Sequence, residues 1–417
     1  MTDKETHGGA LAGPSARRRL IRVFMVGMLC FHLLLFLKLW NRIQRGYPDF
    51  TAFYAAGRTL HDGLGASLYD LRTEYRVQGQ FANISSRHGP LPYIHPPFEA
   101  LVFLPLSLVP YTQAFVAWNL FNLIALLCVA LLLRPHLNAS STIPVWEFLL
   151  GFLAFFPTFL NLLQGQDSIL LLLLFTLAFV ALKQQADFLC GCWLALGTFK
   201  FQFAIPVVLL IVIWNRKRVA AGFASVLLLL VLLSAALVGW NELLQYPRFI
   251  LHIAGARDLG DVPPAFMPNL RGLAEGWSIG SRGWAPKILT LLGSAILLLW
   301  AATKRNTLNG PHVHTGFSLA VVVSVLVGWH TNIHDLVLLI LPLLLVLDSS
   351  LLLPLGTTRK WGGLLPALSL LFTPLWILLW LGGSKVNVMA IPLLWLTWEI
   401  AKQLSTIDPE KVGVSMK

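Results

Sequence analysis

The fold of this chain is decided by the apolar run LIRVFMVGMLCFHLLLFLKLW, which extends from Leu20 to Trp40, and by the comparable runs that follow it. Of the 417 residues, 56% are hydrophobic and only 12% are charged. About 20 apolar residues suffice for a helix to cross a bilayer, and a spanning segment must satisfy its backbone hydrogen bonds internally. Leu-rich runs with scattered Gly and Pro favour helices over barrel strands. The sequence therefore predicts an all-α, polytopic membrane helix bundle.

The basic residues predict how this bundle is oriented, because Lys and Arg collect in cytoplasmic loops. Three arginines precede the first run, so residues 1–19 are expected in the cytoplasm and the run is interpreted as a retained signal anchor. The strongest later cluster, Arg216-Lys217-Arg218, also falls inside if Pro97–Val109 is a helix lying on the membrane. The alternative, in which Pro97–Val109 is a short span, would invert everything downstream.

With the surface helix in place, the chain threads into about twelve membrane helices, of which Tyr111–Leu133 runs inward and Val145–Asn161 outward. The apolar pair Phe188–Thr198 and Phe203–Trp214 is broken near Lys200, which is expected at a dip in the outer face. The predicted organisation is a cytoplasmic N-terminus at 1–19, one transmembrane domain at 20–402 with outer loops at 41–110 and 241–283, and a cytoplasmic tail at 403–417.

Composition excludes several function classes. The formal net charge is +12, but the basic residues stand in short connections, so nucleic-acid binding is not expected. No HExxH, P-loop, GxGxxG or metal-spaced Cys/His set occurs, so no cofactor is predicted. Gly165-Gln166-Asp167 and His334-Asp335 permit a divalent metal but do not indicate one. The four cysteines lie in apolar runs and are interpreted as small buried hydrophobes: Cys30, Cys128, Cys190 and Cys192.

Unusual polar residues gather at one face of the threaded chain. The first is Asp49 in the stretch YPDFTAFYAAG (Tyr47–Gly57), where the membrane gives way to water. Ionisable residues kept near hydrocarbon are costly and usually mark function. The set predicted at the outer membrane boundary is Asp49, His95, Gln164, Gln166, Asp167, Lys200, Gln202, Asn269, Arg271, His334 and Asp335.

Each of these residues also has an ordinary structural explanation. Asp49 can solvate a loop, while Asp167 and Asp335 can cap the helices that follow them. Lys200 can extend its charged end to the interface, and His95 can be a turn residue before two prolines. These explanations do not account for the one-sided clustering.

The clustered residue types suit a lipid-phosphate substrate. A carboxylate such as Asp49 can remove a proton from an acceptor hydroxyl within hydrogen-bond reach. Lys200 or Arg271 can neutralise a phosphate leaving group, and arginine can hold it through two parallel hydrogen bonds. Aromatic residues near the boundary, Tyr54 and Trp277 among them, can stack on a sugar face.

Three segments of the first outer loop resemble those of glycosyltransferase family 87: Asp49–Gly57, Leu68–Asp70 and Tyr93–Phe98. Leu163–Asp167 looks like the family's Gly-Gln-Asn element with Asp in place of Asn. Phe199–Gln202 is similar to its Lys-Pro segment with Phe in place of Pro, and His330 with His334-Asp335 resembles its late His/Asp element. The resemblance covers roughly residues 45–345. The members of this family are GT-C-type membrane mannosyltransferases that use polyprenol-phosphate-mannose.

The resemblance implies inverting transfer of a hexose, mannose in the family, from a polyprenyl-phosphate donor to a glycan or glycolipid acceptor. It implies Asp49 as general base and a bacterial inner membrane with a periplasmic active site. The departures at Asp167 and Phe201 leave glucose, arabinose or an aminosugar open. The residues expected to bind substrate are Tyr54, His95, Gln166, Asp167, Lys200, Gln202, Arg271, His334 and Asp335.

Other functions remain open at this stage. A transporter or flippase of lipid-linked sugars would want charges near the midplane on broken helices in symmetry-related halves. A non-catalytic scaffold would tolerate substitution of Asp49. An O-antigen-ligase-like enzyme would want a large late outer loop with a key Arg and His, and the loop at 241–283 keeps it open.

Overall fold

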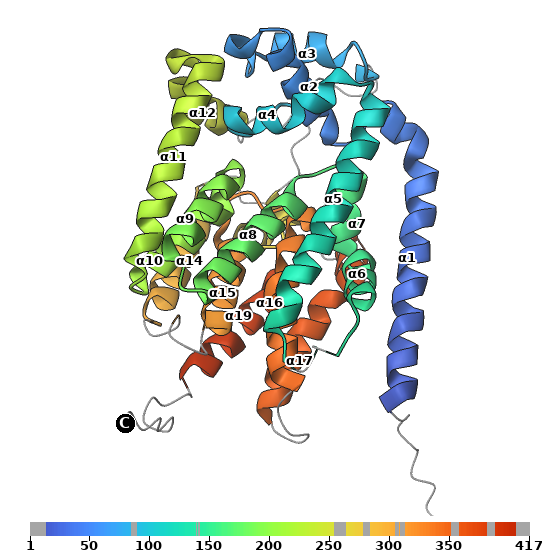
Figure 1. The fold of residues 1–417 in the computed structure, drawn as a ribbon, viewed down its shortest axis with the longest axis vertical. Coiled ribbons are helices and arrows are strands. Elements are labelled where there is room, and N and C mark those ends of the chain that lie inside the picture. Colours follow the sequence, from blue (N-terminus) through green and yellow to red (C-terminus); the bar gives the residue numbers. More distant parts are fainter. Residues whose placement is uncertain are drawn as a thin grey trace, which may run out of the picture.

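The structure is a computed structural model that describes residues 14–84, 90–138, 140, 142–253, 264–277, 284–304, 308, 313–351, 358–381 and 388–405. All regular elements among these residues are α- or 3-10 helices, so the all-α prediction is confirmed (Figure 1). The α-helices are α1 (Pro14–Gln44), α2 (Phe50–His61), α3 (Leu71–Gln78), α4 (Ala100–Phe103), α5 (Tyr111–Leu133), α6 (Val145–Ala154), α7 (Phe156–Gln164), α8 (Ser168–Lys183), α9 (Asp187–Leu196), α10 (Phe201–Ile213), α11 (Lys217–Val238), α12 (Trp240–Ile253), α13 (Leu270–Trp277), α14 (Ala285–Ala302), α15 (Val313–Val327), α16 (Ile340–Leu351), α17 (Thr358–Leu371), α18 (Thr373–Leu381) and α19 (Ala390–Ser405). Short 3-10 helices adjoin them at Gly65–Ser67, Pro97–Glu99, Pro105–Leu108, Arg134–His136, Gly197–Lys200, Pro264–Phe266 and Ile333–Leu339.

Several of these helices are membrane spans by length and composition. Within the described ranges, six stretches qualify, or seven if the bent pair α6–α7 is one broken span. The six are Arg18–Gln44, Tyr111–His136, Asp187–Ile213, Lys217–Val238, Ala285–Ala302 and Ile333–Ser350. They identify an integral membrane protein. The described residues do not show twelve spans, and that number stays a prediction.

One of the six stretches folds back on itself. A straight helix from Asp187 to Ile213 would separate its ends by roughly 40 Å. Instead, the Asp187 carboxylate lies 3.2 Å from the guanidinium of Arg216, just beyond the end of α10. The helices α9 and α10 are therefore the two arms of a hairpin, and its tip is the 3-10 turn Gly197–Lys200. This agrees with the predicted break near Lys200.

A proline explains why the predicted span Val145–Asn161 is bent. Pro157 has no N–H to donate to the carbonyl of Leu153, and Phe155 is extended, so α6 and α7 meet at 73°. The freed Leu153 carbonyl lies 3.2 Å from Nδ1 of His32 on α1, whose ring stacks on Phe159. The break in one span therefore supplies a docking point for another.

The helices α2, α3 and α4 with their 3-10 turns form a layer at one end of the molecule, which we call the loop layer (residues 50–108). α12 lies beside it, and the start of α1 and the end of α19 lie at the opposite end (Figure 1). The segment Pro97–Val109, predicted as a surface helix, forms the short α4 and its flanking turns.

Small residues of α2 let the loop layer pack tightly. A Cβ on Gly57 would lie 2.5 Å from the carbonyl oxygen of Phe103, so only glycine permits this approach. Phe53 stacks on Phe103 with ring centroids 4.7 Å apart, and Phe50 packs edge-on against Phe115 of α5. The stretch Asp49–Gly57 is therefore a core element of this layer and not a solvated loop.

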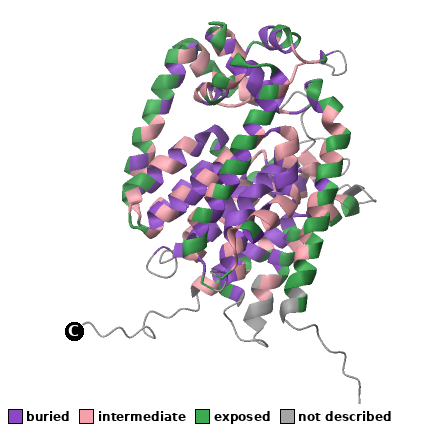
Figure 2. Cartoon of the chain, turned by 45° about the vertical axis from the view of Figure 1, so that its right-hand side comes forward, coloured by how far each residue is buried: buried purple, intermediate pink, exposed green. Residues whose placement is uncertain are grey.

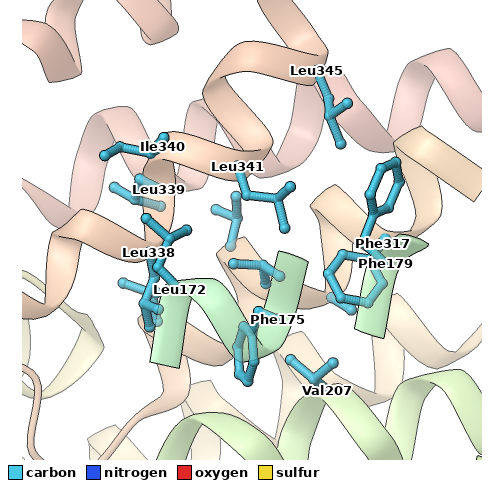
Figure 3. Packing of buried hydrophobic residues seen from close by; sticks show 14 of the residues in the cluster. Leu172, Phe175, Phe179, Val207, Phe317, Leu338, Leu339, Ile340, Leu341 and Leu345 are labelled. Carbon is cyan, nitrogen blue, oxygen red and sulfur yellow. The ribbon is translucent and has the colours of Figure 1, made fainter. Parts of the chain in front are cut away.

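Below the loop layer, the bundle has a core of its own. Leu172, Phe175 and Phe179 of α8 pack against Val207 of α10, Phe317 of α15 and the leucines of Ile333–Leu351 (Figure 3). Buried residues concentrate in this middle region, while α1 is largely exposed (Figure 2). In a bilayer such packing, and not exclusion from water, holds helices together.

Candidate active site

Asp49 precedes α2, but its side chain is not used as a helix cap. Instead, Nε2 of Gln166 donates a hydrogen bond to Oδ2 of Asp49 at 2.8 Å. The backbone N–H of Asp49 donates to Oε1 of Gln164 at 3.3 Å. The carboxylate is partly exposed. Asp49 is therefore held at the junction of the loop layer and the bundle with a carboxylate oxygen available to a ligand.

A glycine turn aims Gln166 at Asp49. Gly165 ends α7 in the left-handed conformation with φ +60°, which glycine adopts without steric cost. A Cβ at this position would lie 2.7 Å from Cβ of Phe50. The indole N–H of Trp118 donates to the Gly165 carbonyl at 3.0 Å. The turn thus fixes the direction of the two side chains that follow it.

The second of these, Asp167, belongs to a buried charge network. Its Oδ1 lies 2.8 Å from Nζ of Lys200, and it makes no cap hydrogen bond to α8. Lys200 also contacts Oδ1 of Asp335 at 2.5 Å and donates to Oγ of Ser168 at 2.6 Å. Ser168 in turn donates to Asp335 at 2.7 Å. Lys200 is only 4% exposed, so it pairs with two carboxylates rather than reaching for the interface.

Asp335 serves two purposes at once. Its Oδ2 accepts the backbone N–H of Asn332 at 2.8 Å, which caps the helical turn that begins at Ile333. Its Oδ1 faces Lys200 and Ser168. The capping explanation is therefore correct for Asp335, but it accounts for only one of the two oxygens.

His95 approaches the network from the loop layer. Its Nδ1 lies 3.3 Å from Oδ2 of Asp167 and 2.9 Å from Oε2 of Glu99. The His95 backbone carbonyl accepts the hydroxyl of Tyr69 at 2.8 Å, and Glu99 accepts the hydroxyl of Tyr93 at 3.1 Å. Glu99 is not among the residues predicted from the sequence. Its signal was one carboxylate in an apolar stretch, four residues after His95.

Burial and neighbouring charges shift the pKa values of these groups in opposite directions. Burial opposes protonation of His95, but the carboxylates of Glu99 and Asp167 outweigh it and raise the pKa of the imidazole. Burial raises the pKa of Glu99 to about 8, although His95 opposes the shift. Burial would also raise the pKa of Asp167, but Lys200 and His95 outweigh it and the net shift is downward. Of the two neighbouring carboxyl groups, Glu99 and Asp167, the ionised one is therefore Asp167.

The remaining predicted residues surround the turn at 328–335. Gln202 donates to the carbonyl of His330 at 3.3 Å, and Asn269 donates to the carbonyl of Gly328 at 2.6 Å. The guanidinium of Arg271 lies over the ring of Trp329 at 4.5 Å and donates to its carbonyl at 3.1 Å. His334 places Nε2 at 3.6 Å from Asp335. These residues border the network without forming its centre.

One predicted residue does not join the group. Tyr54 is buried in the loop layer, where its hydroxyl donates to the carbonyl of Val109 at 2.8 Å and its ring packs on Phe81 and Tyr111. The side chain of Trp277 lies outside what the structure describes.

The arrangement suits proton transfer beside a group of buried polar and charged residues. We call this group the wall, and it consists of His95, Glu99, Asp167, Ser168, Lys200 and Asp335. Asp49 can accept a proton from a hydroxyl placed at the junction, because one oxygen is fixed by Gln166 and the group is not fully buried. Among the described residues, one group has the composition of a metal site: His95, Glu99 and Asp167, whose ligand atoms lie within 4.8 Å of one another. The residues of this wall come from the loop layer, α8, the α9–α10 hairpin and the turn before α16.

Comparisons with known proteins give this geometry its context. No solved structure matches the chain. A curated relative from Mycobacterium tuberculosis (strain CDC 1551 / Oshkosh) is 28% identical over 226 residues, which is 52% of this chain and 50% of the relative. That protein is a polyprenol-phosphate-mannose-dependent alpha-(1-2)-phosphatidylinositol pentamannoside mannosyltransferase. The chain thus spans about half the length of the curated relative it matches.

The family comparison covers more of the chain. The sequence profile of glycosyltransferase family 87 matches residues 93–330, more than half of the 417 residues. The matched range contains His95, Glu99, Gln166, Asp167 and Lys200, and it begins after Asp49. On this match, the chain belongs to glycosyltransferase family 87.

Proposed function

We propose that this protein transfers a hexose, mannose in the first instance, from a polyprenyl-phosphate donor to a hydroxyl of a glycan or glycolipid, with Asp49 as general base. The observation that carries the proposal is the hydrogen bond from Gln166 to Asp49 at the boundary between the loop layer and the bundle. The relative's dependence on polyprenol-phosphate-mannose supports the choice of donor.

In the proposed reaction, Asp49 takes the proton of the acceptor hydroxyl while the hydroxyl oxygen attacks the anomeric carbon of the donor sugar. The bond from that carbon to the phosphate oxygen breaks, and polyprenyl phosphate leaves with the bonding electrons. Attack from the face opposite the leaving group inverts the anomeric centre. The charge that grows on the leaving phosphate has to be met by fixed positive groups.

The donor is proposed to bind along the wall opposite Asp49. The residues assigned to substrate binding are Tyr54, His95, Gln166, Asp167, Lys200, Gln202, Arg271, His334 and Asp335. For Tyr54 the assignment is weakest, because its hydroxyl is already bonded within the loop layer. Arg271 is the cation best suited to a phosphate, because guanidinium groups bind phosphate through two parallel hydrogen bonds.

The proposal also has an orientation. The loop layer and Asp49 face the outside of a bacterial inner membrane, and the start of α1 and the end of α19 face the cytoplasm. The position of these two helix ends, opposite the loop layer, supports this (Figure 1). Reporter fusions placed after Arg218 and after Trp277 are expected to report opposite sides, and the same side for both would contradict the orientation. The full count of about twelve spans belongs to the same proposal.

The decisive experiment measures release of polyprenyl phosphate from polyprenol-phosphate-mannose by purified protein supplied with mixed glycan and glycolipid acceptors. Asp49→Asn is expected to lower turnover roughly a hundredfold or more, since a general base contributes about that much. Asp62→Asn is the matched control, because Asp62 is an exposed carboxylate at the end of the same helix that pairs only with Arg58 among the contacts described. Undiminished turnover in a folded Asp49→Asn protein would remove Asp49 from the mechanism. Absence of turnover with any lipid-linked sugar would favour transport of such lipids instead.

A further inference from the structure

The buried network beside Asp49 brings three carboxyl groups together. Asp167 and Asp335 share the ammonium of Lys200, and Glu99 lies next to Asp167. Buried carboxyl groups are costly unless a proton or a cation offsets them.

The atoms of His95, Glu99 and Asp167 converge in a manner that hydrogen bonding does not explain. Nδ1 of His95 is close to one oxygen of each carboxylate, yet neither approach has hydrogen-bond geometry, and Nδ1 is left without a hydrogen-bond partner. Oε1 of Glu99 is likewise without a hydrogen-bond partner, and the contacts of the Asp167 oxygens are the ion pairs with Lys200 and His95. Glu99 is 1% exposed and Asp167 is 0% exposed, so water does not satisfy them. Buried polar atoms in this state call for another occupant.

The spacing of these atoms fits a metal ion. The ligands of an octahedral ion with bonds of about 2.1 Å lie about 3 to 4.2 Å apart. Here, Nδ1 of His95 lies 2.9 Å from Glu99 Oε2 and 3.3 Å from Asp167 Oδ2, and all three ligand atoms lie within 4.8 Å of one another. Asp167 divides its oxygens, because Oδ1 faces Lys200 and Oδ2 faces His95. An ion bound to Oδ2 thus need not displace the lysine.

We propose that His95, Glu99 and Asp167 bind a divalent cation of the Mn²⁺ type, and that this cation faces the phosphate of the lipid donor. Carboxylate oxygens suit Mg²⁺ and Mn²⁺, and an imidazole nitrogen shifts the preference toward transition metals, so Mn²⁺ matches the mixed set. Three protein ligands leave coordination positions open for phosphate oxygens. The role toward the phosphate rests on the proposed function, whereas the binding of the ion does not.

One ligand of the proposed ion is adjacent in sequence to the residue that holds the candidate base. Asp167 directly follows Gln166, whose amide holds Asp49. The turn at Gly165 therefore directs one side chain to the base and the next to the ion. A cation here would stabilise charge on the leaving phosphate, which is one established way in which metal ions catalyse group transfer.

The test measures Mn²⁺ binding without any sugar donor. Protein in nanodiscs is first stripped with EDTA and then titrated with Mn²⁺, and the free ion is followed by electron paramagnetic resonance. We expect one bound Mn²⁺ per chain with a coupling to imidazole nitrogen in the pulsed spectrum. Glu99→Gln and Asp167→Asn are each expected to weaken binding tenfold or more, and His95→Gln is expected to remove the nitrogen coupling.

Glu74→Gln is the matched control. Glu74 is a second buried glutamate of the loop layer whose pKa burial raises to about 8, but it accepts the backbone N–H of Tyr93 and lies outside the cluster. This variant is expected to bind Mn²⁺ like the wild type. Absence of bound Mn²⁺ in the wild type, or binding without nitrogen coupling, would overturn the site even if every variant failed to fold. Binding that survives unchanged in folded Glu99→Gln would do the same.

The transfer assay separates the ion from the function. Turnover that falls on EDTA treatment and returns with Mn²⁺ supports the assigned role. Equal turnover with and without EDTA would leave the transferase standing and overturn the role of the ion. Mn²⁺ binding in a protein without any transfer activity would instead keep the site and contradict the proposed function.

Discussion

The loop layer and the bundle are two cores of different kinds. The loop layer is built from aromatic rings whose polar ends are hydrogen-bonded, as in Tyr54, Tyr69 and Tyr93. The bundle core is mainly Leu, Val, Ile and Phe, and its helices approach through small residues such as Gly191 and Gly222. The hydrophobic effect stabilises a core of the first kind, and close packing of helices in lipid stabilises a core of the second kind. The candidate site lies where they meet, so each supplies part of the wall.

The largest effect should come from breaking the buried ion pairs on the bundle side of the boundary. Lys200→Met removes the ammonium that Asp167 and Asp335 share, and leaves both carboxylates buried without it. The expected loss is about 3 to 5 kcal/mol in the free energy of unfolding, because an uncompensated buried charge is strongly destabilising. Chemical or thermal unfolding in detergent checks it.

The double variant Lys200→Met/Asp335→Asn is expected to recover part of that stability, since one of the two orphaned charges is gone. If Lys200→Met unfolds at the wild-type midpoint, these ion pairs do not contribute to the stability of the bundle.

Two substitutions of intermediate effect, one in each core, test whether the two cores unfold independently. Gly57→Ala places a Cβ against the Phe103 carbonyl in the loop layer, and Gly222→Ala places one 1.9 Å from the Phe188 carbonyl between α11 and α9. Each is expected to cost about 1 to 3 kcal/mol, the usual cost of overpacking. Hydrogen exchange should then rise within residues 50–108 for Gly57→Ala and within α9 and α11 for Gly222→Ala.

Gly27→Ala is the control for this pair, because a Cβ there meets nothing within 4 Å. Faster exchange across both cores from either single change would mean that loop layer and bundle unfold as one cooperative unit, and the comparison would fail.

The smallest effect concerns Tyr54. Tyr54→Phe removes only the hydrogen bond to the Val109 carbonyl and leaves the ring in place, so the expected cost is about 0.5 to 1.5 kcal/mol. Turnover and KM for the lipid donor are expected to stay within about twofold of wild type, since removal of an uncontacted hydroxyl does not change transition-state binding. A clear rise in KM would return Tyr54 to the sugar site.

Much of the fold could be predicted, because spans in a bilayer must be helical and apolar. The helix Tyr111–Leu133 has the predicted bounds, and the hairpin turns at the predicted break near Lys200. The bend between α6 and α7 was missed, because the apolar pattern continues through Phe155 and only Pro157 marks the break.

The residues of the site could be predicted in part, but their contacts could not. One-sided clustering brought together Asp49, His95, Gln166, Asp167 and Lys200, but it could not give their pairing. Glu99 was missed because Asp167 lies far along the chain, and a position four residues after His95 does not by itself distinguish Glu99 from a surface carboxylate. Pairing depends on how the loop layer sits on the bundle, and hydropathy carries no information about that.

The α9–α10 hairpin also sets an order of events during synthesis. Its arms have ten and thirteen residues, each shorter than the roughly 20 that span a bilayer alone. Lys200 emerges after Asp167, yet its second partner, Asp335, follows 135 residues later. At 5 to 20 residues per second, Lys200 waits roughly 7 to 27 s for that carboxylate. During this time Lys200 can pair with Asp167 but not with Asp335. The buried charge network is therefore complete only after the turn before α16 has been synthesised.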